Sequence, residues 1–157
     1  MFLIASTLIV VSCSSDRTQD VQIKKAAEIH KKAIAKHDSI MAILKKQKKQ
    51  VERNLETETI ESNIQSYKAM LKSIDKSMVL LNEWDDELIG VPGVEHDHGH
   101  DHDHSHQDDI LDDLSDKEIL EIQVAYSEHL DKIEDKISEV ITTIELYSQD
   151  AEETTQK

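Results

Sequence analysis

The residues whose type and spacing indicate chemistry are six histidines that alternate with other residues near the middle of the chain. They are six of the nine histidines in the 157 residues, and they are His96, His98, His100, His102, His104 and His106. Neutral imidazole is a good ligand for Zn²⁺, Cu²⁺ and Ni²⁺. Three acidic residues between them supply oxygen ligands and counter-charge, and these are Asp97, Asp101 and Asp103. The pattern predicts a transition-metal site, with Zn²⁺ first and Cu²⁺ or Ni²⁺ as alternatives. The competing interpretation is a solvated polar loop.

Residues 1–12 are uncharged and mostly apolar, and Cys13 follows them. A run of this length is too short to span a bilayer but suits the apolar region of a signal peptide. The sequence Val10-Val11-Ser12-Cys13 resembles a bacterial lipobox, although no Lys or Arg precedes the apolar run. This interpretation makes Cys13 the lipid-modified first residue of the mature protein. The alternative is an ordinary buried thiol.

The rest of the chain is typical of long helices, since it has 3% aromatic residues, three glycines and one proline. Three stretches carry apolar residues at alternating spacings of three and four, which predicts amphipathic helices. Gly90, Pro92 and Gly93 are expected to end the second helix. Ser115-Asp116-Lys117-Glu118 is a capping box, with Leu114 placed to contact Ile119 at the start of the third helix.

We therefore predict an all-α fold, an antiparallel bundle of three long amphipathic helices with a disordered His/Asp-rich loop between the second and third helices. In chain order, the predicted parts are a signal peptide at 1–12, a lipidated Cys and tether at 13–20, a helical hairpin at 21–89, a His/Asp-rich loop at 90–114, a third helix at 115–149 and a disordered tail at 150–157. This topology brings the loop back to the end where the first helix begins, beside the tether.

Two histidines at helical positions raise the possibility of a second metal site within the bundle. If the connection between the first two helices lies near 54–59, residue 37 faces about 76, and 76 faces about 129 on the third helix. This register would gather five side chains at one level, namely His37, Met41, Asp75, Met78 and His129. A His/Met set suits copper and a His/Asp set suits zinc. The alternative, which we favour, is that the histidines are boundary residues and the methionines fill the core.

A lipobox, His37-Asp38-x-x-Met41, the pair Met78 and Trp84 and an Ile-rich last helix resemble a family of small bacterial lipoproteins. These proteins often carry the label "viral A-type inclusion protein". The resemblance implies a helical protein of the cell envelope and no established reaction. Met78 and Trp84 stand further apart here than in that family, and the His run is an addition.

Charge and motifs narrow the function classes. Residues 13–88 carry 14 Lys/Arg and 13 Asp/Glu, whereas residues 89–157 carry 4 and 20. The acidic second half favours cations as partners and argues against nucleic acid. No nucleophile elbow, phosphate loop or HExxH motif is present, so we do not expect an enzyme. We predict a membrane-anchored extracytoplasmic lipoprotein of the bacterial envelope, in the outer membrane, that binds transition metal for buffering or delivery. The alternative is a non-catalytic envelope protein that binds a protein partner and whose His loop is incidental.

Overall fold

The computed structural model describes residues 20–94 and 111–155, with side chains as far as Ser148. The all-α prediction is confirmed, because the described residues form helices and contain no β-strand. The long helices are α1 (Val21–Thr57), α2 (Glu61–Glu87) and α4 (Asp116–Thr155). α4 extends beyond residue 149, where the sequence pattern placed the end of the third helix.

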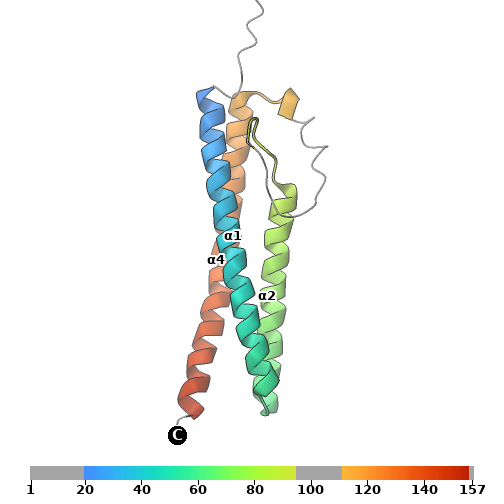
Figure 1. Ribbon diagram of the computed structural model, residues 1–157, viewed down its shortest axis with the longest axis vertical. Coiled ribbons are helices and arrows are strands. Elements are labelled where there is room, and N and C mark those ends of the chain that lie inside the picture. The colour runs from blue at the N-terminus through green and yellow to red at the C-terminus, as the bar shows by residue number, and fades with distance from the viewer. Residues whose placement is uncertain (1–19, 95–110, 156–157) are drawn as a thin grey trace, which may run out of the picture.

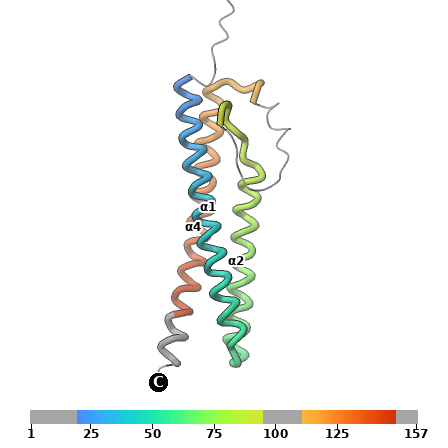
Figure 2. The backbone as a smooth tube through the Cα atoms, viewed as in Figure 1, coloured from blue at the N-terminus to red at the C-terminus, as the bar shows by residue number. Residues whose placement is uncertain are grey.

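The three long helices lie side by side and form an elongated rod (Figure 1). α2 runs opposite to α1, and α4 runs in the same direction as α1 (Figure 2). Each helix contacts both of the others. As a result, the start of α1 and the start of α4 lie at one end of the rod, which we call the loop end, and the chain continues toward this end after α2 has stopped short of it (Figure 1).

Each helix buries the stripe of residues that faces its two neighbours. Most of the buried residues are aliphatic, and the main core cluster extends from Ala33 to Ile144. On α1 the buried stripe includes Ala26, Ala33 and Ile40. Ile60 is 58% exposed because it precedes the first turn of α2. The core is narrow, so a few large side chains contribute much of its buried area.

Salt bridges between helices mark the register. Lys36 on α1 contacts Asp131 and Glu134 on α4 at 2.8 and 2.6 Å. These two hydrogen bonds raise the pKa of Lys36. Lys48 on α1 contacts Asp75 on α2 at 2.7 Å. All these side chains are at least one-third exposed, so the pairs add little stability.

The turn between α1 and α2 is organised by one carboxylate. Glu58 accepts hydrogen bonds from the backbone N–H groups of Thr59 and Ile60, both at 2.8 Å, and from the Asn63 side chain at 2.9 Å. These bonds lower the pKa of Glu58. A carboxylate beside a helix N-terminus also complements the helix dipole. Glu58 thereby fixes the point at which the chain reverses.

The predicted capping box at the start of α4 is confirmed. The hydroxyl of Ser115 accepts from the backbone N–H of Glu118 at 3.3 Å, and the Glu118 carboxylate accepts from the backbone N–H of Ser115 at 2.8 Å. The carboxylate also accepts from the Ser115 hydroxyl, and these bonds to Ser115 lower the pKa of Glu118. The capping box fixes the first turn of α4 and therefore the point where the chain returns from residues 95–110.

We predict that Ser115→Ala lowers the free energy of unfolding by about 1 kcal/mol, since an alanine cannot accept the bond from an N-terminal N–H group. Urea denaturation followed by circular dichroism measures the change. The matched control is Ser138→Ala on the exposed surface of the middle of α4, where alanine is the better helix former and stability should not fall. Equal losses in the two variants would show that the capping box contributes nothing.

Candidate functional site

The predicted metal-binding histidines, His96 to His106, and the acidic residues between them lie outside the described residues, as does Cys13. The structure does describe where the chain enters and leaves this segment. The chain departs after Val94 and returns at Leu111, and both positions are at the loop end of the rod (Figure 1). The candidate site is therefore built from the end of the bundle that holds these two points.

A separate apolar cluster covers the loop end. Val91, just before the His-rich segment, and Leu111, just after it, are 3% and 8% exposed. They pack in one cluster with Ile23 and Ala26 of α1 and Ile119 of α4. The chain makes a tight turn from Val91 to Val94: Val94 donates its N–H to the carbonyl of Val91 at 3.0 Å, and Gly93 has a φ of 76°, which favours glycine. The described chain on either side of residues 95–110 is thus packed against the start of α1.

A buried hydrogen-bond chain beneath that cluster connects α1 and α4 with the segment that follows α2. The side-chain N–H of Gln123 donates to the carbonyl of Ile89 at 2.7 Å. The Gln123 carbonyl oxygen lies 2.9 Å from Nδ1 of His30, so that ring nitrogen carries the hydrogen and donates. His30 and Gln123 are 0% and 1% exposed. This chain fixes the segment that leads from α2 into the His-rich residues.

Trp84 forms the next layer of the bundle. Its indole N–H donates to the backbone carbonyl of Tyr126 on α4 at 3.0 Å. Its ring stacks on His37 of α1, with the ring centroids 5.6 Å apart and an interplanar angle of 21°. The hydroxyl of Tyr126 in turn donates to the carbonyl of Glu87 at the end of α2. Trp84 is 1% exposed, so it is part of the core of the bundle.

His37 is a buried imidazole with one satisfied nitrogen. Its Nδ1 lies 3.1 Å from the carboxylate of the neighbouring Asp38, which identifies Nδ1 as the donor. Its Nε2 is buried and has no hydrogen-bond partner in the part of the chain that the structure describes. The stack on Trp84 gives the ring an apolar face to pack against, which is the role of a core or boundary residue.

The structure does not bring the five residues of the predicted bundle metal site together. His37 lies against Trp84 and not against residue 76. Asp75 pairs with Lys48, and His129 is exposed on the surface of α4. Met41 is buried and Met78 is partly buried in the core cluster, as expected for methionines that fill space. Within residues 20–94 and 111–148, no group of three or more His, Cys, Asp or Glu side chains is arranged to hold a metal ion.

Sequence reasoning missed Gln123, one of the residues that organise the loop end. Gln123 follows Ile119 by four residues and precedes Tyr126 by three, so it occupies a core-facing position of the repeat. A polar residue at such a position was the available signal. The described helices do not combine the length and the apolarity that are needed to cross a bilayer.

We predict that Gln123→Met lowers the free energy of unfolding by roughly 1–3 kcal/mol, because methionine keeps the volume but removes the bonds to the Ile89 carbonyl and the His30 ring. Urea denaturation measures the loss. The control is Gln65→Met, an exposed position on α2, which should change stability by less than about 0.5 kcal/mol. A Gln123→Met protein as stable as the parent would contradict a structural role for this chain of bonds.

The chain was compared with protein-family models, with curated proteins and with solved structures. None of the three comparisons found a match. The functional interpretation therefore depends on this chain's own residues, above all on the six alternating histidines and on the end of the bundle from which they extend.

Proposed function

We propose that this protein is a lipid-anchored, extracytoplasmic metal-binding protein of the bacterial envelope. An antiparallel bundle of three helices carries a His/Asp-rich loop that binds transition metal, chiefly Zn²⁺, for buffering or delivery. The observation that carries the proposal is the run of six histidines at alternate positions with aspartates between them, from His96 to His106. Side chains of these two types are the ligands of choice for Zn²⁺ when no cysteine is present.

The arrangement of the loop end supports the proposal. Val91 and Leu111 hold the two ends of the segment in one apolar cluster. Between Val94 and Leu111 lie sixteen residues, 95–110, a length that allows several histidines to approach one ion. The bundle thus acts as a holder for the loop, while the metal ligands come from the loop itself.

Ligand redundancy determines what kind of site this would be. One tetrahedral Zn²⁺ needs four ligands, and six histidines with three neighbouring aspartates offer many equivalent sets. Without second-shell groups that fix the orientation of each imidazole, affinity falls short of that of a structural zinc site. Several weak, rapidly exchanging sites suit capture over a range of metal concentrations better than permanent retention.

The proposed anchor is consistent with the topology. α1 begins at Val21, a few residues after Cys13, and its start lies at the loop end (Figure 1). A lipid on Cys13 would therefore keep the metal-binding loop close to the membrane surface.

We predict that the chain binds more than one Zn²⁺, weakly, and that binding falls steeply between roughly pH 7 and pH 5.5. Metal binds only neutral imidazole, whose ordinary pKa is about 6.5, so protons compete in this range. Isothermal titration calorimetry at several pH values measures both stoichiometry and affinity.

The control for this titration replaces the six loop histidines with serine and leaves His30, His37 and His129 unchanged. This variant should lose Zn²⁺ binding and keep its far-ultraviolet circular dichroism, because the described helices pack without the loop. A single tight site that is insensitive to pH, or full binding by the control, would contradict the proposal.

We predict that Cys13→Ser abolishes labelling by a radioactive fatty acid and leaves the protein as an unprocessed precursor or in the soluble extracytoplasmic fraction. The reason is that serine has no thiol to accept the lipid. Ser15→Ala, two residues later, should be labelled and anchored like the parent. Equal labelling of the Cys13→Ser protein and the parent would rule out lipidation at this residue.

A further inference from the structure

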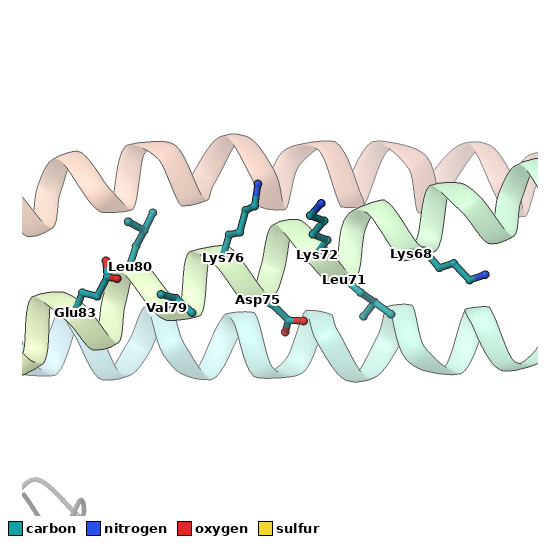
Figure 3. Close-up of a pocket in the computed structure, with 8 residues that line it drawn as sticks. All are labelled: Lys68, Leu71, Lys72, Asp75, Lys76, Val79, Leu80 and Glu83. Atoms are coloured by element: carbon teal, nitrogen blue, oxygen red, sulfur yellow. The ribbon is translucent and has the colours of Figure 1, made fainter.

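The outward surface of α2 carries charged and apolar side chains in a regular order. A shallow groove of about 720 Å³ follows this surface between Lys68 and Glu83, lined by side chains of α2 (Figure 3). We call this surface the α2 face. Two of its apolar residues, Val79 and Leu80, are 52% and 39% exposed. Exposed apolar side chains beside lysines and carboxylates are typical of a surface that another helix covers.

Two antiparallel copies of this face would match each other. When the copies are centred on the midpoint between residues 75 and 76, each lining residue of one copy lies opposite a lining residue of the other. Lys68 then meets Glu83, Asp75 meets Lys76, Leu71 meets Leu80, and Lys72 meets Val79. Two of the four pairs join opposite charges and one joins two leucines. In the fourth pair, the methylene groups of Lys72 can pack on Val79.

We propose that the α2 face is the contact between two copies of this chain in a symmetric, antiparallel dimer. A two-fold axis brings the same surface of both copies together, so the surface must be self-complementary when one copy is rotated onto the other. The axis passes between residues 75 and 76. Each pair named above then occurs twice in the dimer.

The side-chain directions fit this packing. On the α2 face, Lys72, Lys76 and Leu80 point toward α4, whereas Leu71, Asp75 and Val79 point toward α1 (Figure 3). In an antiparallel pair of helices, each layer contains one residue from each row, one from each copy. The three pairs formed by these six residues each join a residue of one row to a residue of the other, as this geometry demands. Asp75 also pairs with Lys48 of its own chain, and its side chain is 53% exposed, which leaves it accessible to a second cation.

A parallel arrangement of the same two faces is disfavoured by charge. It would place each of the lysines 68, 72 and 76 beside its own counterpart in the other copy, and like charges at such distances repel. The antiparallel arrangement removes these contacts and replaces two of them with opposite-charge pairs. The sequence of the face therefore determines the direction of the partner helix.

The dimer is weak. The face extends over residues 68 to 83, about 22 Å at 1.5 Å per residue. One helix face of this length buries less than the roughly 800 Å² per partner of a standard stable interface, so dissociation constants of tens of micromolar or more are expected. Because the charged pairs are exposed at the edges of the contact, added salt weakens the dimer further.

A charge-exchange experiment tests the contact. Sedimentation equilibrium of the 157-residue chain at low salt should show a concentration-dependent monomer–dimer equilibrium. Lys68→Glu places two carboxylates together in each of the symmetric pairs, and Glu83→Lys places two lysines together, so each single variant should dimerise at least about tenfold more weakly. The double variant, Lys68→Glu with Glu83→Lys, restores opposite charges and should dimerise like the parent. An equimolar mixture of the two single variants should form a heterodimer.

The matched controls make the same charge changes at exposed positions of α4, as Lys132→Glu and Glu145→Lys, and should leave the equilibrium unchanged. Circular dichroism of every variant verifies that the monomer is folded. The proposal is overturned if the parent remains monomeric up to about 1 mM, or if the single variants dimerise as well as the parent. It is also overturned if the monomeric parent binds vesicles of anionic lipid through Lys68, Lys72 and Lys76, since the occupant of the face would then be a lipid surface.

Discussion

The packing of Trp84 is the interaction on which the rest of the bundle depends. This one side chain belongs to α2, stacks on His37 of α1 and donates its indole N–H to the Tyr126 carbonyl of α4. A narrow core built largely from aliphatic residues permits several helix registers of similar energy, because sliding by one heptad replaces one aliphatic contact by another. A single buried indole with a directional hydrogen bond does not permit such sliding, because no other register offers it an equivalent contact. Trp84 therefore selects the register in which all three helices meet it.

The buried polar residues one layer closer to the loop end add to this selection. Burying His30 and Gln123 without hydrogen-bond partners would lower the stability of the fold. In the observed register, Gln123 accepts from His30 and donates to the Ile89 carbonyl. Polar groups in a helical core commonly set alignment at some cost in stability. Here the alignment has a functional consequence, since the carbonyl of Ile89 belongs to the segment that leads directly into the proposed metal-binding loop.

The sequence allowed much of the fold to be predicted and little of its internal register. Apolar spacing located the three helices, and the Ser115–Glu118 capping box was correct in each hydrogen bond, because both signals are local. The bundle metal site failed because it needed the register between α1 and α2. α1 continues to Thr57 and α2 begins at Glu61, later than the 54–59 connection assumed. Moving a turn by one residue shifts the facing residue by two, so the later turn moves the residue that faces His37 away from 76 and toward Trp84, on which His37 stacks. Gln123 is polar, so the apolar spacing that predicts the third helix does not identify it as a core position.

The distribution of charge connects the proposed loop function with the proposed dimer. Residues 89–157 carry 20 acidic and 4 basic residues, and residues 95–110 between Val94 and Leu111 hold six of the acidic ones and no Lys or Arg. A parallel dimer would bring two such segments together at one end, where each would repel the other and both would compete for the same cations. In the antiparallel dimer, the ends of the two α2 helices at Glu87 are about 35 Å apart at 1.5 Å per residue from the midpoint of the face. That separation is several Debye lengths at physiological salt, so the two proposed loops would attract metal without interference from each other. The proposed two-fold axis that pairs Lys68 with Glu83 would therefore keep the two proposed metal-binding loops electrostatically independent.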